Sequence, residues 1–392
     1  MKISNRATKL LFTILAPALL SMSAFGQEHP QHDDHHGEAT EQHVDDHANH
    51  DDHADHHGEA DQEFDAVDMI MHHIQDAHEW HLVDIPQEDG TSKPVSIPLP
   101  VILYYNGQLD VFMSSAFHHG HSPVTKGDVT YIMDHGNIYV ANAQGELEYD
   151  EEHHALNDKP LDLSITKNVA AMFLSILLLV WIFGSTAKNY KKTHVPRGMA
   201  KFMEPLVLFV RDDIARPNIE GDKYKRYLPF LLTIFFFIWI NNLLGLIPVL
   251  APNVTGNIAF TFVLAAFTLL IILFSGNKAY WGHILLPPVP WWLYIIMVPV
   301  EIIGIFTKPF ALMIRLFANI TAGHILILSL VSLIFIFKTA WMSLMSVPFM
   351  IFMFTLELLV AALQAYIFTL LAALFIGMAV EEHHGHGEED VI

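Results

Sequence analysis

The amino-acid sequence predicts an all-α integral membrane protein with five membrane crossings. The last two crossings form a long tilted helical hairpin, and a surface helix and a small extracytoplasmic β-rich unit near the amino terminus complete the fold. Of the 392 residues 52% are apolar, and beyond position 165 they form runs of 18 or more with almost no charge. That is the length that a hydrocarbon core of about 30 Å requires. The formal charge of -21 comes mostly from residues 28–158, so the acidic and apolar parts of the chain are separate.

Composition excludes several classes of function. A strongly acidic segment repels nucleic acid, so no nucleic-acid partner is expected. The chain has no cysteine, which excludes disulfides, thiol catalysis and zinc sites with cysteine ligands. It also lacks a Gly-rich phosphate-binding loop followed by Lys and Ser or Thr. We therefore expect no enzyme activity from this chain by itself and no cofactor.

Residues 1–26 are predicted to be a secretory signal peptide. Lys2, Arg6 and Lys9 form a basic start, residues 10–20 are an apolar stretch too short to span comfortably, and residues 24–26 offer a small-x-small cleavage pattern. An uncleaved anchor is the alternative. In either case the following residues are expected outside the cytoplasm.

Residues 27–65 are predicted to be a disordered leader rich in His and acidic residues, because they contain no apolar period to bury. The segment 34–39 returns as 55–60. Histidine tracts can bind zinc, copper or nickel weakly, and the candidates are His35, His36, His56 and His57. A solvated, pH-buffering tail with incidental metal affinity is the favoured interpretation.

Residues 66–164 are predicted to form the small β-rich unit. Two strand-like runs, 101–105 and 109–113, flank Asn106-Gly107, a strong hairpin signal. A second pair, 129–133 and 138–140, flanks residues 134–137. The histidines at 118–121 could bind a metal, but a plain surface loop is favoured.

Residues 165–380 are predicted to be the membrane domain, with spans at 167–187, 228–250 and 258–275. Between the first two, residues 188–227 hold ten of the twenty-one Lys and Arg residues, and positively charged loops stay in the cytoplasm. This places the mature amino terminus in the periplasm and the tail, 381–392, in the cytoplasm.

The basic segment also predicts a surface helix. Apolar residues recur in it at helical spacing among charges, which suits a helix on the membrane surface, and Pro217 is expected to end it. These residues are Phe202, Leu206, Phe209, Val210 and Ile214.

Two long apolar segments remain, 309–337 and 348–380. As helices they would be about 44 and 50 Å long, against a hydrocarbon core of about 30 Å. They must therefore tilt steeply or bend.

Few charged groups lie in these spans, and such groups are functional by default because each costs about 2.5–3.5 kcal/mol at a helix centre. Arg315 has no carboxylate within three turns on its own helix. A guanidinium keeps its proton, so it can attract a carboxylate but cannot relay protons. We infer a counter-ion from another chain, and a buried pair with Glu357 is the alternative.

His324 and Glu357 are predicted to meet near the outer surface. His324 lies nine residues after Arg315, half a turn off its face, and Glu357 enters early on the returning helix. An imidazole beside a carboxylate is suited to proton transfer, although the two could also serve only to join the helices.

Glu301 lies on the cytoplasmic side of Arg315, where it could serve an inner proton path. It also lies seven residues before Lys308, so a structural ion pair with Lys308 is an equally good interpretation. Asn319 shares the face of Arg315 one turn on. Gln364 lies seven residues after Glu357, at the depth of Arg315.

The segment Lys308-Pro309 followed by residues 315–324, Arg-Leu-Phe-Ala-Asn-Ile-Thr-Ala-Gly-His, resembles the signature of the a subunit of F-type ATP synthases. Residues 241–248 and 363–368 resemble the outward helix and the last helix of that family, and the resemblance covers about 165–384.

The resemblance implies a proton-translocating subunit of a bacterial inner membrane, with two half-channels beside a ring of c subunits. Arg315 would be the essential arginine facing the ring carboxylates, with Asn319 and Gln364 as its polar neighbours. His324 and Glu357 would form the outer half-channel and Glu301 the inner one. Implied partners are the c-subunit ring, the b subunits of the peripheral stalk, the lipid bilayer and, indirectly, the soluble ATPase sector.

The alternative function is a proton- or metal-coupled secondary transporter with a His-rich external collector. Such a transporter would need broken helices and convergent His or Asp ligands at mid-membrane. The spans contain His324 alone.

Overall fold

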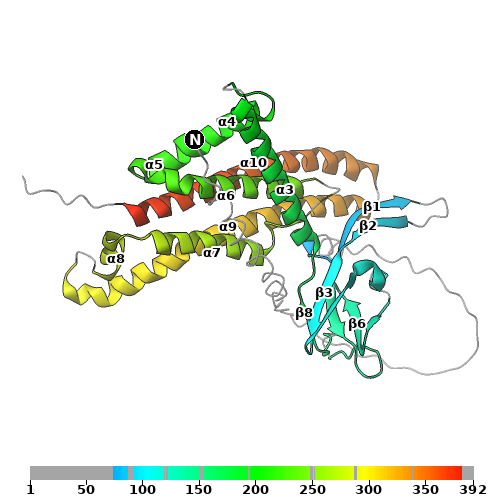
Figure 1. The fold of residues 1–392 in the computed structure, drawn as a ribbon. Helices are drawn as coiled ribbons and strands as arrows, with labels where there is room; N and C mark the ends of the chain where they lie inside the picture. The colour runs from blue at the N-terminus through cyan, green and yellow to red at the C-terminus, as the bar shows by residue number, and fades with distance from the viewer. Residues whose placement is uncertain are drawn as a thin grey trace, which may run out of the picture.

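The computed structural model describes residues 74–86, 92–118, 120, 122–150, 154–192, 195–247, 250, 252–286, 289–337 and 339–381. The strands gather at one end of the molecule (Figure 1). Helices α6, α7, α9 and α10 lie side by side, and α3 crosses them at a steep angle. The predicted signal peptide, the leader and residues 382–392 lie outside the described residues.

The β-rich unit consists of three small antiparallel sheets. The first pairs β1 (Glu79–Pro86) with β2 (Ser92–Pro98). The second has the order β4-β3-β8, formed by β3 (Pro100–Tyr105), β4 (Gln108–Met113) and β8 (Leu161–Asp162). The third has the order β5-β6-β7, formed by β5 (Val124–Lys126), β6 (Val129–Asp134) and β7 (Asn137–Val140).

Both predicted hairpins are present. Tyr105 pairs with Gln108 across Asn106 and Gly107, which have φ of 48° and 86°. These left-handed angles suit a two-residue hairpin turn, and Asn and Gly adopt them most readily. The pair of β1 and β2 is additional to the two hairpins that the sequence pattern predicts.

The unit has its own apolar core around Phe117 and Tyr131, both fully buried. The Tyr131 hydroxyl donates to Asp110 Oδ2 at 2.8 Å. Burial, and then this carboxylate, raise the pKa of Tyr131. The unit is thus a packed body rather than a set of loops.

The helices follow in chain order. They are α3 (Lys167–Lys192), α4 (Met199–Phe209), the π-helical segment η2 (Val210–Ala215), α5 (Arg216–Asn218), α6 (Tyr224–Gly245), α7 (Ile258–Ser275), α8 (Lys278–Leu285), α9 (Tyr294–Phe337) and α10 (Ala340–Val380). Short 3-10 segments are η1 (Ser114–Phe117), η3 (Gly221–Lys223) and η4 (Trp291–Leu293).

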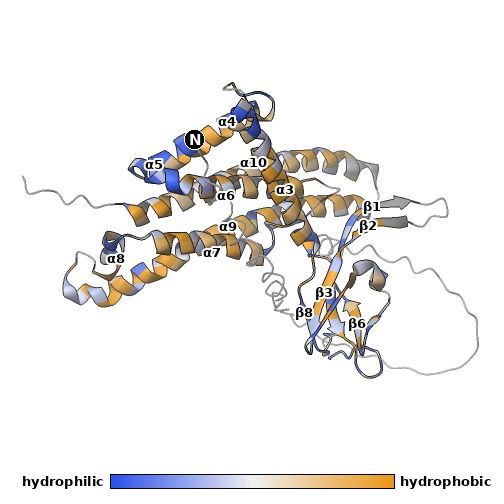
Figure 2. Ribbon diagram, in the orientation of Figure 1, coloured by the Kyte–Doolittle hydropathy of each residue, from blue (hydrophilic) through white to orange (hydrophobic). Residues whose placement is uncertain are grey.

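Five helical segments of the described chain are long and apolar enough to cross a membrane. Their hydrophobic colouring in Figure 2 contrasts with the mixed colouring of the β unit. Span α7 has the predicted bounds, and the Asn257 side chain accepts from the backbone N–H of Ala259 at 3.0 Å to cap its start.

The last two helices are longer than the sequence predicted. Helix α9 begins at Tyr294 rather than Pro309 and passes through Pro299 and Pro309, and α10 begins at Ala340 rather than Pro348. Their 44 and 41 residues correspond to about 66 and 62 Å. Proline ends helices in water because it lacks an N–H, but membrane helices tolerate it where neighbours satisfy the freed groups.

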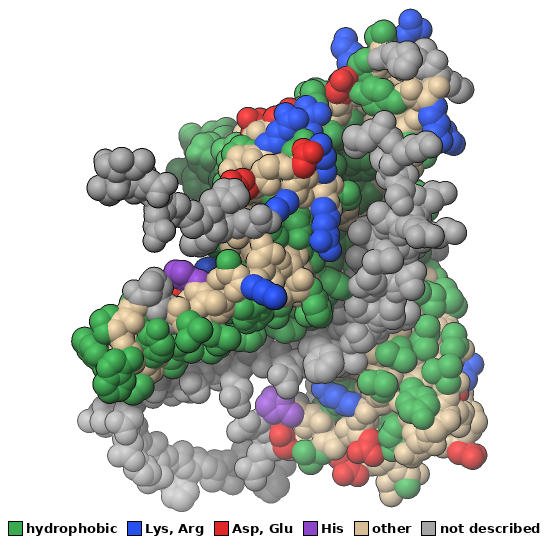
Figure 3. Space-filling model, turned by 60° about the vertical axis from the view of Figure 1, so that its left-hand side comes forward, with side chains coloured by type: hydrophobic (Ala, Val, Ile, Leu, Met, Phe, Trp, Pro, Cys, Tyr) green, Lys and Arg blue, Asp and Glu red, His purple; other side chains and the backbone are tan. Residues whose placement is uncertain are grey.

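The predicted surface helix exists and buries most of its predicted apolar face. Val210 and Ile214 are fully buried in the core with α6 and α10, and Leu206 and Phe209 pack partly buried against it, whereas Phe202 is 62% exposed. The π-helical segment η2 changes the period within this helix and so rotates the later residues relative to the earlier ones. Lys and Arg side chains gather in the upper part of the molecule in Figure 3, with hydrophobic side chains over long stretches elsewhere.

Small residues let α10 approach its neighbours closely. Ala365, Ala372 and Ala373 are fully buried in the main core, where they meet residues of α6 and α9 such as Ile238 and Leu316. Close packing of small residues is the usual basis of helix association in membranes. It positions α10 against α6 and α9, where the polar residues lie.

Candidate functional site

His324 of α9 and Glu357 of α10 lie side by side. His324 Nε2 is 3.6 Å from Glu357 Oε1, and the two side chains are 15% and 6% exposed. The distance is longer than a direct hydrogen bond. Among the described residues, neither carboxyl oxygen of Glu357 has a hydrogen-bond partner. The pair is therefore held by its surroundings rather than by its own contact.

Two glycines make room for the pair. A Cβ on Gly323 would lie 2.6 Å from Glu357 Oε1, so the carboxyl group rests directly against the backbone of α9. A Cβ on Gly245, at the end of α6, would lie 3.0 Å from the Pro252 carbonyl oxygen and 3.6 Å from His324 Nε2. The sequence analysis does not predict a role for either glycine, although Gly245 and Gly323 lie within the segments 241–248 and 315–324 that resemble the family.

Buried amides tie the surrounding elements together. Asn242 of α6 donates to the Ala361 carbonyl of α10 at 3.3 Å and accepts from the Thr255 hydroxyl at 2.7 Å. Asn241 donates to Ser175 of α3 at 3.1 Å. Because a buried amide without partners costs free energy, these contacts fix the register of α3, α6 and α10.

Arg315 lies on the opposite side of α9 from His324. Its side chain is exposed, and no described carboxylate lies within ion-pairing distance of it. The alternative of a buried Arg315–Glu357 pair is wrong, because Glu357 lies against His324 and Gly323 instead. One turn on, Asn319 donates to Gln364 Oε1 at 3.1 Å, and Gln364 is buried.

Glu301 and Lys308 do not form the ion pair that their spacing allowed, as far as the described residues show. Lys308 lies over the Phe375 ring, 5.5 Å from its centre. Burial, and then the negative charge of Glu301, raise the pKa of Tyr280 in α8. Glu301 therefore lies near the start of α9, separate from the His324–Glu357 pair.

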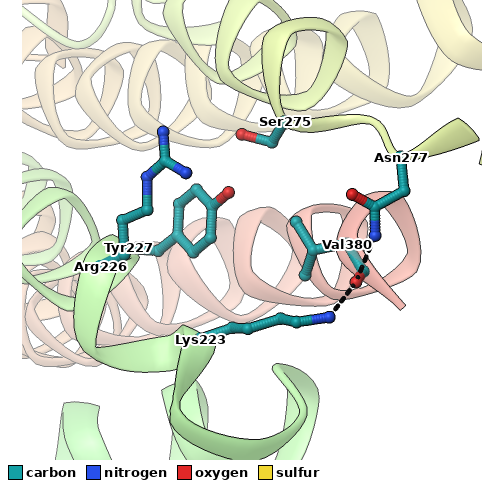
Figure 4. Close-up of a pocket in the computed structure, with 6 residues that line it drawn as sticks. All are labelled: Lys223, Arg226, Tyr227, Ser275, Asn277 and Val380. Atoms are coloured by element: carbon teal, nitrogen blue, oxygen red, sulfur yellow. Dashed lines mark hydrogen bonds between the residues drawn. The ribbon is translucent and has the colours of Figure 1, made fainter. Parts of the chain in front are cut away.

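A cavity of about 190 Å³ lies where α6 begins and α7 and α10 end (Figure 4). Lys223 Nζ and Asn277 Nδ2 both donate to the Val380 carbonyl, at 2.9 and 2.8 Å. These contacts satisfy the last carbonyl groups of α10, as helix ends require. The contacts of Lys223 and Asn277 thus hold the end of α10 in place. Val380 is about 34 Å along the helix from Glu357, so the cavity is not part of the surroundings of the His324–Glu357 pair.

The described residues contain no group of three or more His, Asp or Glu placed to hold a metal ion. The weak metal candidates of the leader, His35, His36, His56 and His57, lie outside the described residues. Of the cluster at 118–121, His118 ends the short helix η1 with a left-handed φ of 46°.

Two sequence families match different parts of the chain. Residues 169–377 match the family described as ATP synthase A chain. Residues 69–163 match a domain of unknown function (DUF8433). The two matches divide the chain where the β unit meets α3.

Curated relatives match this chain over most of their own length. ATP synthase subunit a of Chloroherpeton thalassium (strain ATCC 35110 / GB-78) is 52% identical over 238 residues, 58% of this chain and 70% of the relative. The protein of the same name from Myxococcus xanthus (strain DK1622) is 47% identical over 247 residues, 62% and 81%. That of Chlorobium phaeobacteroides (strain DSM 266 / SMG 266 / 2430) is 46% identical over 280 residues, 68% and 80%.

Proposed function

Since the chain belongs to the ATP synthase A chain family, and is thus a membrane subunit for ion transport in ATP synthesis, we propose a specific division of labour among its polar residues. Arg315 is the fixed positive charge that faces the carboxylates of a c-subunit ring. Asn319 and Gln364 are its polar neighbours, His324 and Glu357 form the outer half-channel, and Glu301 lies in the inner one.

The observation that carries this proposal is the exposure of Arg315 on an apolar helix without an anionic partner in the described part of the chain. A lone charge in a span is costly, and a guanidinium cannot neutralise itself by losing its proton. A ring of membrane carboxylates would supply the missing counter-ions one at a time. Protons would then pass Arg315 only on those carboxylates.

The His324–Glu357 pair supplies the second part of the proposal. An imidazole and a carboxyl group a few ångströms apart can pass a proton between them, because both groups, unlike a guanidinium, can bind and release protons. On this basis the transported ion is H⁺. The b subunits and the soluble sector are the further partners, and the mature amino terminus is periplasmic while the carboxyl terminus is cytoplasmic.

Disulfide cross-linking in this cysteine-free chain tests the ring contact. Ile314→Cys, beside Arg315 and 38% exposed, should cross-link to a cysteine placed near the ring carboxylate, whereas Leu316→Cys, which is fully buried, should not. Cross-linking at neither position in an assembled complex would refute the ring contact.

Thiol labelling tests the orientation. Leu156→Cys in the β unit should react from outside the cell and Lys191→Cys at the end of α3 only from inside, since both positions are exposed. The reverse pattern would overturn the proposed topology.

A further inference from the structure

The β-rich unit docks on the membrane domain beside the His324–Glu357 pair. Trp80 of β1 and Leu99, just before β3, are buried against Met172 of α3, Val254 of the α6–α7 loop and Phe260 of α7. The Trp80 indole N–H donates to the Leu250 carbonyl at 2.8 Å. A buried tryptophan whose N–H is also satisfied makes a specific contact as well as an apolar one.

A polar contact fixes the same junction at the start of α3. Asp76 Oδ1 accepts from the Asn168 N–H at 3.0 Å, and Oδ2 accepts from the Thr166 hydroxyl at 2.8 Å. A carboxyl group in this place accepts hydrogen bonds from N–H groups that have no partner within the helix, and its negative charge is stabilised by the positive end of the helix dipole. Burial raises the pKa of Asp76, and these hydrogen bonds oppose the rise.

The loop that Trp80 contacts, between α6 and α7, also lies beside the His324–Glu357 pair. The Pro252 carbonyl and His324 lie against the same face of Gly245, and the Gly256 carbonyl accepts from Thr321 at 3.4 Å, three residues before His324. Through Thr255 and Asn242 the same loop reaches the Ala361 carbonyl, four residues after Glu357. Residues 252–256 therefore contact α9 directly and are linked to α10 through Asn242 of α6.

Lys167 gives a second link between the unit and the start of α3. Its ammonium donates to the Gln75 carbonyl at 3.2 Å, and its backbone N–H donates to the Ala77 carbonyl at 2.8 Å.

We propose that the β-rich unit is a positioning element of the outer half-channel, in which Trp80 holds residues 250 and 252–256 of the α6–α7 loop against the His324–Glu357 pair. The inference rests on the proposed function of that pair. It gives a role to a region that matches a domain of unknown function, and it makes Trp80 a positioning residue rather than one that carries protons. The physical reason is that the pair lacks a hydrogen bond of its own at 3.6 Å, so its geometry depends on the backbone around it.

Three variants of the complete ATP synthase in sealed vesicles test this role. Trp80→Ala should lower proton flux by roughly tenfold or more, because a misplacement of about 1 Å can cost up to a hundredfold in a positioned reaction. Trp80→Phe keeps the apolar ring and should restore at least half of the flux. Trp341→Ala, the same substitution at a side chain that is 77% exposed, is the matched control and should leave flux unchanged.

Amide hydrogen exchange in the intact complex separates positioning from general damage. Trp80→Ala should speed exchange in residues 250–256 while the core of the β unit around Tyr131 stays protected. Unchanged exchange in the loop, or full flux in assembled Trp80→Ala complexes, would overturn the inference, as would equal losses for Phe and Ala. Because loop exchange does not depend on the role of the pair, it can be read even if the proposed half-channel is wrong.

Discussion

Arg315 and His324 lie nine residues apart on α9, yet their environments differ in kind. Arg315 is exposed and has no ion pair among the described residues, whereas His324 is 15% exposed, with Glu357 3.6 Å away, Gly245 beside His324 and Gly323 beside Glu357. In the proposed function the first site is completed by another chain, while the second is assembled from three helices and a loop of this one. The difference teaches how the proposal divides the polar residues: an exposed charge within an apolar span is assigned to a partner surface, and a largely enclosed polar pair is assigned to an internal path.

The largest effect is expected at Arg315. Arg315→Gln should reduce proton-driven ATP synthesis to background while insertion persists, because removing a lone charge makes insertion easier. Arg315→Lys should fail nearly as badly, since an ammonium can lose its proton when desolvated and lacks the planar fork. Synthesis rates in vesicles with matched amounts of subunit check both, and a working Lys variant would mean that approximate charge is enough.

The pair is tested by exchanging its members. His324→Glu alone sets two carboxyl groups together and Glu357→His alone sets two imidazoles together, so each should lower proton flux by roughly a hundredfold. The double exchange should recover a measurable part of the flux, because the path again has one group of each kind. Such non-additivity indicates direct coupling.

A double exchange no better than the worse single variant, at equal protein levels, would show that His324 and Glu357 act separately. His324 and Glu357 would then not form a shared internal proton path, and the contrast with Arg315 would not hold in that respect.

Gly323→Ala is expected to have an intermediate effect. The added Cβ would lie 2.6 Å from Glu357 Oε1, so the carboxyl group must shift and proton flux should fall by about tenfold. Gly304→Ala on the same helix is the matched control, since a Cβ there meets nothing within 4 Å. Flux measured in vesicles should be unchanged in the control, and equal losses in both would point to α9 itself rather than to the pair.

The smallest effect is expected from the leader. Deleting residues 28–63 should leave proton-driven ATP synthesis within about twofold of the full chain, because the described contacts that join the β unit to the membrane domain come from position 75 onward. The measurement is ATP synthesis after an imposed pH step. Loss of synthesis in a normally assembled complex would show that the leader takes part in proton supply.

Sequence by itself determined the number of spans, the two hairpins of the β unit and the set of polar residues worth testing. Long apolar runs, Asn-Gly turns and lone charges are local signals, and each follows from the cost of burying or exposing a particular group. The opposite faces of Arg315 and His324 also followed from helical spacing alone, and the structure agrees with it.

Only the tertiary structure decided what those residues meet. It separated Lys308 from Glu301, carried α9 through Pro299 and Pro309, and placed Gly245 and Gly323 against the pair. It also brought Trp80 to Leu250, 170 residues later in the chain. These contacts join segments that are far apart in sequence. They depend on the close packing of the helices and of the docked β unit, and a local sequence pattern contains no information on that packing.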